Sequence, residues 1–320
     1  MSLPAEIDHL HPEAQLMIRA GAEKGVKNYE DADTIEESRA IVETLCAETT
    51  QAANYHYKGE KQIYTVPSPH SQAGIPLWVY RPKPCPPSPT LLVFFHGGGF
   101  VVCSTRTHEI LMQMMADFTG CIVANVDYRL APENKFPAQL EDSIVAVNWV
   151  MENKELIGGS KSSKVGTIGD SVGGQLATTT AYEIPGLAFQ VLLYPVTDWR
   201  LNKDSYKRYK EGYFLSTKQM EWFASLAFGS VAERSDPRSS PLLRPQLENL
   251  PPALCVVASH DVLVDEGIEY AEKLKAAGVH TEIMKVEGVM HAYLSFPCFY
   301  KENVKVTLEK IKEFVNMFGN

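Results

Sequence analysis

Short apolar runs alternate with longer amphipathic segments from residue 91 to the end of the chain. The runs are nearly continuous in Val, Ile and Leu, which is typical of parallel strands buried on both faces, whereas the segments between them repeat near every 3.6 residues, as helices do. This alternation predicts an α/β fold with a mostly parallel central sheet flanked by helices. The predicted strands are 91–95, 121–127, 165–168, 188–194, 253–258 and 281–286, and the predicted helices are 107–119, 137–153, 174–183, 265–277 and 302–317.

The first ninety residues have a different pattern. In residues 5–53, apolar residues recur about every 3.6 positions, which predicts helices. Two short strands are predicted at 62–66 and 75–80, on either side of a Pro/Ser/Gly turn. The proline-rich stretch 82–89 can form neither a helix nor a central strand. Because the sheet pattern continues after it, we interpret this stretch as a surface connection within one domain.

One long segment interrupts the alternation. Residues 199–245 are rich in Tyr, Phe and Trp, and a structureless loop of that length is uncommon in a compact domain. We therefore expect a helical cap over the carboxyl edge of the sheet, which is where ligands bind in such sheets. The alternative is that these aromatic residues form only a local core.

Composition narrows the class of protein. The 320 residues are 45% hydrophobic and 22% charged, which is ordinary for a globular protein and excludes disordered and fibrous classes. The net charge of −9 gives no reason to expect a nucleic acid or an anionic membrane as a partner. The first residues carry no signal-peptide pattern and no apolar run reaches the ~18 residues of a membrane span, so we expect a cytoplasmic protein. The six cysteines lack metal-site spacing and predict free thiols and no metal.

The segment Gly169–Gly173 reads G-x-S-x-G, between a predicted strand and a predicted helix. In serine hydrolases this pattern forms the nucleophile elbow, a tight turn that exposes the serine and points free helix N–H groups beside it. The glycines are needed because a Cβ at either position would meet neighbouring backbone. The pattern therefore makes Ser171 a candidate nucleophile. The alternative is a glycine-rich turn with an exposed serine.

Acyl transfer by a serine needs a base and an acid that orients the base. In α/β-hydrolases both follow the serine along the chain, the acid first. Asp261 ends a predicted strand, whereas Asp265 lies at the start of the next helix, where acids commonly cap. Of the three later histidines, His260 shares the loop of the acid and His280 lies at the opposite edge of the sheet. The sequence therefore favours His291, just past the last strand.

A second glycine cluster, His96–Phe100, follows the predicted strand 91–95. Consecutive glycines let backbone N–H groups turn toward one point, so Gly97, Gly98 and Gly99 are candidate oxyanion donors together with the N–H of Val172. A phosphate site is the alternative, but the cluster lacks the P-loop lysine and the dinucleotide spacing.

Several segments resemble the motifs of the hormone-sensitive-lipase-like esterases, and the similarity covers most of residues 75–300. The matching segments are His96–Phe100 (HGGGF), Asp127–Glu133 (DYRLAPE) with Phe136–Ala138 (FPA), Gly169–Gly174 (GDSVGG), Glu211–Leu215 (EGYFL), Asp236–Leu242 (DPRSSPL) and Asp261–Gly267 (DVLVDEG). The resemblance implies an α/β-hydrolase fold, carboxylester hydrolysis without a cofactor, and a cap made of the N-terminal helices and the insertion. It also implies that Gly98 and Gly99 are the glycines that donate to the oxyanion.

The implied organisation places the N-terminal part of the cap at 1–53, the cap insertion at 199–245, and the catalytic domain at 54–198 and 246–320. The sequence departs from the family pattern around the site. Val172 stands where alanine is usual, Val262 where proline is usual, and Ala292-Tyr293 where glycine and phenylalanine are common. None of these changes removes a catalytic atom, but they alter the pocket.

We therefore expect a serine carboxylesterase with a small-molecule ester substrate, acting through an acyl-enzyme. The aromatic cap favours short-chain or aromatic esters, with Phe100, Tyr213 and Phe214 as candidate pocket residues. An arylacetamide-type amide deacetylase and a non-catalytic small-molecule receptor of the same fold remain alternatives. The resemblance leaves a homodimer open.

Overall fold

The computed structural model describes residues 7–25 and 27–319, so the parts of the predicted ranges 1–53 and 246–320 that fall on residues 1–6, 26 and 320 lie outside the described residues. An eight-stranded sheet forms the centre of the molecule, with strand order β1-β2-β4-β3-β5-β6-β7-β8. The strands are β1 (Glu60–Ser68), β2 (Ser71–Arg81), β3 (Leu91–Phe95), β4 (Ile122–Val126), β5 (Val165–Asp170), β6 (Gln190–Leu193), β7 (Ala253–His260) and β8 (Thr281–Met290).

Strand pairing confirms the predicted sheet. β1 and β2 form an antiparallel hairpin, and β2 also pairs antiparallel with β4. The remaining neighbours pair in parallel: β4 with β3, β3 with β5, β5 with β6, β6 with β7, and β7 with β8. The carboxyl ends of β3, β5, β7 and β8 therefore meet at one edge, which is where the sequence motifs lie.

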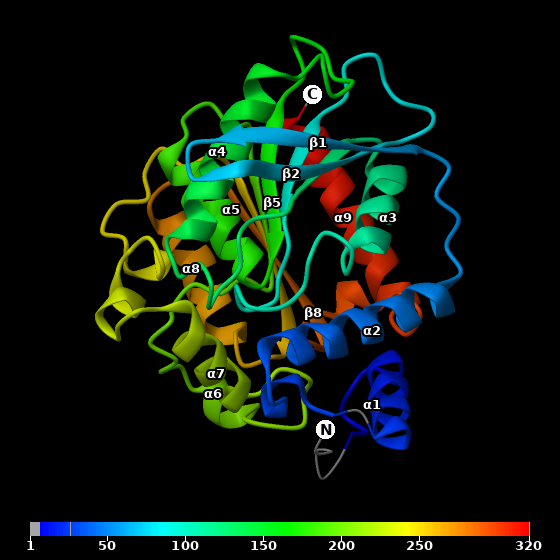
Figure 1. The fold of residues 1–320 in the computed structure, drawn as a ribbon, viewed down its shortest axis with the longest axis vertical. Helices are drawn as coiled ribbons and strands as arrows, with labels where there is room; N and C mark the ends of the chain where they lie inside the picture. The colour runs from blue at the N-terminus through cyan, green and yellow to red at the C-terminus, as the bar shows by residue number, and fades with distance from the viewer. Residues whose placement is uncertain (1–6, 26, 320) are drawn as a thin grey trace.

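Helices cover both faces of the sheet, as the unbroken apolar strands predict. α3 and α9 lie on one face, and α4, α5 and α8 lie on the other (Figure 1). Along β3, Leu91, Val93 and Phe95 join one buried core cluster, whereas Leu92 and Phe94 join the second. The bounds of these helices are α3 (Glu109–Thr119), α4 (Ala138–Glu152), α5 (Val172–Glu183), α8 (Val264–Ala276) and α9 (Lys301–Phe318).

The remaining helices gather at one end of the molecule, where the N-terminal segment and the insertion lie side by side (Figure 1). The two segments are joined by the ion pair between Lys218 and Asp31, 2.6 Å, and by a hydrogen bond from Gln219 to Glu30, 3.0 Å. Among the described residues, no helix is long and apolar enough to cross a membrane. The elements are α1 (Pro12–Lys24), α2 (Ile35–Ala53), α6 (Ser205–Arg208) and α7 (Thr217–Ala227), with short 3₁₀ turns η1 (Tyr29–Asp31), η2 (Ala232–Ser235), η3 (Pro241–Leu243) and η4 (Tyr293–Ser295).

Candidate active site

Ser171 occupies the turn between β5 and α5 with φ 57° and ψ −121°, a conformation that a non-glycine residue rarely adopts. Its N–H donates to the carbonyl of Leu193 at 2.9 Å, which ties the turn to the neighbouring strand. A Cβ on Gly173 would collide with the carbonyl oxygen of Phe95, and one on Gly169 would collide with the backbone of Gly173. The two glycines of the motif are thus required by close backbone approach, and the turn places the serine hydroxyl at the edge of the sheet.

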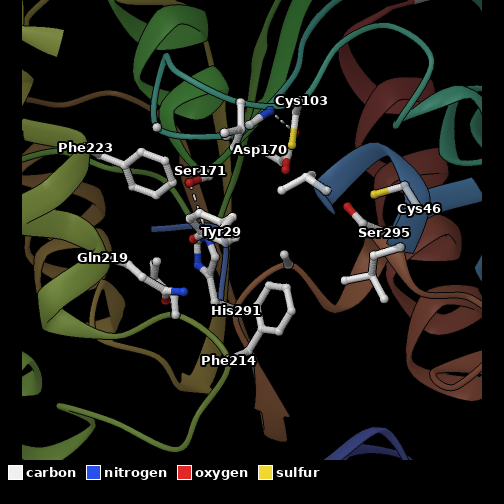
Figure 2. Close-up of a pocket in the computed structure, with 18 of the residues that line it drawn as sticks. Tyr29, Cys46, Cys103, Asp170, Ser171, Phe214, Gln219, Phe223, His291 and Ser295 are labelled. Atoms are coloured by element: carbon white, nitrogen blue, oxygen red, sulfur yellow. Dashed lines mark hydrogen bonds between the residues drawn. The ribbon is translucent and has the colours of Figure 1, made fainter. Parts of the chain in front are cut away.

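His291 and Asp261 lie beside this hydroxyl on neighbouring strand ends. The Nε2 atom of His291 is 3.1 Å from Ser171 Oγ (Figure 2). The Nδ1 atom of His291 is 2.6 Å from Asp261 Oδ2. The other carboxylate oxygen of Asp261 accepts the N–H of Leu263 at 3.0 Å, which fixes the carboxylate. A carboxylate only accepts, so Nδ1 carries the proton and Nε2 is left to accept from the serine. This arrangement can take a proton from Ser171.

The rejected candidates lie elsewhere. His260 bonds Ser259 through Nδ1 at 2.8 Å, and His280 faces Glu282 at 3.6 Å. Asp265 accepts from Ser205 N at 2.9 Å and pairs with Arg208, so its carboxylate holds the insertion to α8. The structure therefore brings together the three residues that the sequence favoured and separates the alternatives from them.

The glycine loop after β3 lies against the elbow. Among the described residues, none accepts the N–H of Gly98, Gly99 or Val172 in a hydrogen bond, so these three donors are available to an oxyanion. The N–H of Gly97, also a candidate donor by sequence, instead donates to Asp170 Oδ1 at 2.8 Å. Because the N–H of Gly97 already donates to this carboxylate, it is not free to bind an oxyanion. Its hydrogen bond holds the loop in place instead.

A cavity opens above Ser171, lined mainly by apolar side chains, several of which come from α2 and α7 (Figure 2). Phe214 lines it as predicted. Phe100 does not, because its ring is fully buried behind the loop against Tyr128 and Trp199. Tyr213 does not either, since it stacks on His260 outside the cavity. The apolar lining is formed by Tyr29, Ile41, Val42, Leu45, Cys46, Val102, Cys103, Val172, Phe214, Leu215, Met220, Phe223, Ala292 and Phe296.

The α2 residues of this lining were missed from the sequence, although Ile41, Val42 and Leu45 lie on one helical face. That spacing shows an apolar stripe but not what the stripe covers. Among the ionisable groups that line the cavity, Tyr29 and Cys103 are neutral near pH 7. Burial raises the pKa of the Cys103 thiol and of the Tyr29 hydroxyl well above their usual values. Within the described part of the chain, no cluster of His, Cys, Asp or Glu could hold a metal ion.

Several known proteins are similar to this chain in sequence and in fold. Residues 92–295 match the family model described as "alpha/beta hydrolase fold". The chain is 37% identical over 236 residues to the ethyl acetate hydrolase of Pseudomonas putida, covering 71% of this chain and 74% of that protein. It is 34% identical over 296 residues to the carboxylic ester hydrolase LipN of Mycobacterium tuberculosis, covering 89% and 77%. A thermostable esterase from Pseudomonas putida ECU1011 superposes with a TM-score of 0.91 over 99% of both chains, at 29% identity.

The chain belongs to this family of the α/β-hydrolase fold. Within it, the protein is a hormone-sensitive-lipase-like carboxylesterase, and thus a carboxylic ester hydrolase.

Proposed function

We propose that this protein is a serine carboxylesterase that hydrolyses short-chain or aromatic carboxylic esters through an acyl-enzyme. The observation that carries the proposal is the hydrogen-bonded chain from Ser171 Oγ through His291 to Asp261, with links of 3.1 and 2.6 Å. All three side chains are buried, so the proton can move between serine and imidazole away from bulk water.

In the proposed reaction, His291 Nε2 takes the hydroxyl proton as Ser171 Oγ bonds to the ester carbonyl carbon. The N–H groups of Gly98, Gly99 and Val172 stabilise the negative oxygen, and the N-terminal end of α5 adds its dipole. The tetrahedral species then breaks its bond to the alcohol, which leaves with the proton from His291. Water repeats the sequence on the acyl-enzyme and releases the acid, so the cycle needs no cofactor.

The cavity supports the substrate class. Its walls are apolar, and Tyr29, Phe214 and Phe223 bring aromatic rings close to Ser171. Such mainly apolar walls favour a small acyl group or an aromatic ring. The relative named ethyl acetate hydrolase points to short acyl chains as well. We further propose that residues 1–53 and 199–245 together act as the cap, because Tyr29, Val42 and Phe223 from those segments line the cavity.

A series of p-nitrophenyl esters tests this proposal. Acetate and butyrate should be hydrolysed faster than palmitate, and Ser171→Ala should lower kcat by at least about 10⁴-fold. Ser295→Ala is a matched control, because this serine also lines the cavity but bonds neither His291 nor Asp261. Equal activity of wild type and Ser171→Ala would refute the serine mechanism.

Two further measurements separate the alternatives. A fluorophosphonate should label Ser171, whereas a receptor of this fold without a working triad would stay unlabelled. Rates on matched aryl acetates and aryl acetamides decide between ester and amide hydrolysis, and we expect the ester to react faster. A faster amide would assign the protein to the deacetylases.

A further inference from the structure

A buried contact between His108 and the carboxyl group of Asp170 lies directly behind the glycine loop, outside the Ser171–His291–Asp261 triad. The Nε2 atom of His108 is 3.2 Å from Asp170 Oδ1, and both side chains are at most 4% exposed. The same Oδ1 atom accepts the N–H of Gly97 at 2.8 Å. Asp170 therefore links His108 to the first glycine of the oxyanion loop, and it directly precedes Ser171.

Counting protons around His108 gives its charge. The hydroxyl of Thr107 donates to the carbonyl oxygen of Ser104, with the two oxygens 2.8 Å apart, and we assign its single proton to this bond. The same Oγ1 atom accepts the N–H of Ser104 at 3.0 Å and is 2.9 Å from His108 Nδ1. With its proton used, Thr107 can only accept from Nδ1, so Nδ1 carries a hydrogen.

The other ring nitrogen also carries a hydrogen. Nε2 faces the carboxylate of Asp170, which only accepts. Burial acts to raise the pKa of Asp170, but the charge of His108 and the hydrogen bonds from His108 and Gly97 outweigh it and lower the pKa. On this assignment of hydrogens, Asp170 is ionised and His108, with both nitrogens protonated, is a cation. Its neighbour His96 is neutral, because burial and the charge of His108 lower the pKa of His96 to about 3.

The pair lies where charge matters to the reaction. A Cβ on Gly97 would be 2.6 Å from Asp170 Oδ2 and 3.1 Å from Ser171 Cβ, so the carboxylate, the loop and the nucleophile are packed together. An uncompensated carboxylate in this place would repel the oxyanion that forms beside Ser171. The imidazolium of His108 removes that repulsion, while Asp170 keeps its hydrogen bond to the loop.

We propose that His108 and Asp170 form a charged positioning pair, in which the imidazolium neutralises the carboxylate that holds Gly97 and thereby the oxyanion donors. Both residues lie at the cavity wall but are at most 4% exposed, so the pair acts through the loop that it holds. The inference rests on the proposed serine mechanism for its effect on rate, but the charge state of His108 can be measured without it.

The first experiment measures that charge. In long-range ¹H–¹⁵N spectra of protein labelled at histidine nitrogen, both ring nitrogens of His108 should be protonated at neutral pH, and the resonances should vanish in His108→Gln. In Asp170→Asn, the amide can donate to Nε2, and His108 should become a neutral ring with one bare nitrogen. One bare nitrogen in the wild-type protein would overturn the proposal.

The second experiment is a double-mutant cycle on kcat. His108→Gln keeps a donor toward Asp170 but removes the charge, and we expect kcat to fall about 10- to 100-fold with little change in KM. Adding Asp170→Asn removes the unpaired carboxylate, and the double variant should regain most of the loss. His280→Gln is the matched surface control, with no expected effect.

The outcomes are distinct. Unchanged kcat in His108→Gln, or a double variant no faster than the single one, overturns the positioning role. If His108→Gln does not fold, Asp170→Asn serves as the test of rate, since its neutral pair keeps both hydrogen bonds and should lose only a few-fold in kcat. A larger loss there contradicts the proposal. If wild type itself shows no activity dependent on Ser171, the proposed function fails, while the nitrogen spectra still decide the charge of His108.

Discussion

The cavity has a floor, formed by Gly97–Gly99, Ser171 and His291, and a roof, formed by α2, η1 and α7. Different interactions hold these two parts in place. The floor rests on buried hydrogen bonds to fixed strand ends, such as those of Gly97 to Asp170 and of Ser171 N to the backbone of β6. The roof also includes contacts that water reaches, such as the ion pair of Lys218 with Asp31. Exposed pairs of this kind add little stability, so the roof can change more freely than the floor.

The family comparison fits this contrast. The matched residues 92–295 contain the whole floor, yet they begin after α2 and so leave the N-terminal half of the roof outside. In the proposed mechanism, the floor carries the groups that any ester needs, whereas the roof contributes side chains to the cavity lining. The contrast predicts that changes in the floor alter kcat and that changes in the roof alter stability or selectivity.

The largest effect is expected from Asp261→Asn in the floor. The amide can donate to His291 Nδ1 and so favour the wrong tautomer, with the lone pair facing away from Ser171. We expect kcat to fall by about 10⁴-fold on p-nitrophenyl acetate, as such changes do in other serine hydrolases. The thermal midpoint should change much less than the rate.

Asp265→Asn is the matched control, because the two acids are close in sequence but Asp265 bonds Ser205 and Arg208 of the insertion. This variant should lower stability and leave kcat nearly unchanged. If both variants lost activity equally, the division between floor and roof would be wrong at this loop.

Gly99→Ala tests a point where floor and roof touch directly. Gly99 has φ +62°, and a Cβ there would collide with the ring of Phe223 on α7. The displaced N–H should lower kcat by about 10²- to 10³-fold, the usual effect of losing an oxyanion donor. The measurement is a kcat comparison with Gly120→Ala, which has φ +75° but open space around it and should keep full activity.

The double variant Gly99→Ala with Phe223→Ala separates the two causes. Recovery of kcat would mean that the ring pushes the loop away, and therefore that the roof restrains the floor. No recovery would mean that the backbone conformation alone places the donor.

The sequence predicted the floor better than the roof. The elbow, the glycine loop and the strand ends are local patterns, and parallel strands bring their ends together whatever lies between them. The sequence places His108 shortly after the glycine loop, but no sequence pattern links it to Asp170. The role of His108 was therefore missed. Phe100 and Tyr213 were placed in the pocket because aromatic residues near a motif suggest a lining. Their rings point elsewhere, and only packing decides that.

Arg39→Met should weaken the attachment of the roof. Arg39 donates from α2 to the carbonyl oxygens of Val101 and Ala131, both at 2.9 Å, and pairs with the half-exposed Glu133. The two carbonyl bonds carry most of the effect, since the ion pair is screened. We expect a loss of about 1–2 kcal/mol in the free energy of unfolding, measured by urea titration. Arg39→Lys keeps the positive charge but cannot make both carbonyl hydrogen bonds, so it should lose nearly as much free energy of unfolding. If Arg39→Lys were as stable as wild type, the effect would instead come from the ion pair with Glu133.

The smallest effect is expected from Ala292→Gly, which lies in the floor beside His291. Ala292 has φ 60°, a left-handed conformation that costs alanine about 1–2 kcal/mol and that glycine adopts freely. The greater freedom of glycine in the unfolded chain offsets part of this gain. The free energy of unfolding of the variant should therefore exceed that of wild type by about 0.5–1 kcal/mol. Ala277→Gly, at φ −80°, should change stability in the opposite direction. If Ala292→Gly is more stable but has a lower kcat, the strain at this residue serves to position the ring of His291. If kcat is unchanged, the floor tolerates relaxation at this residue.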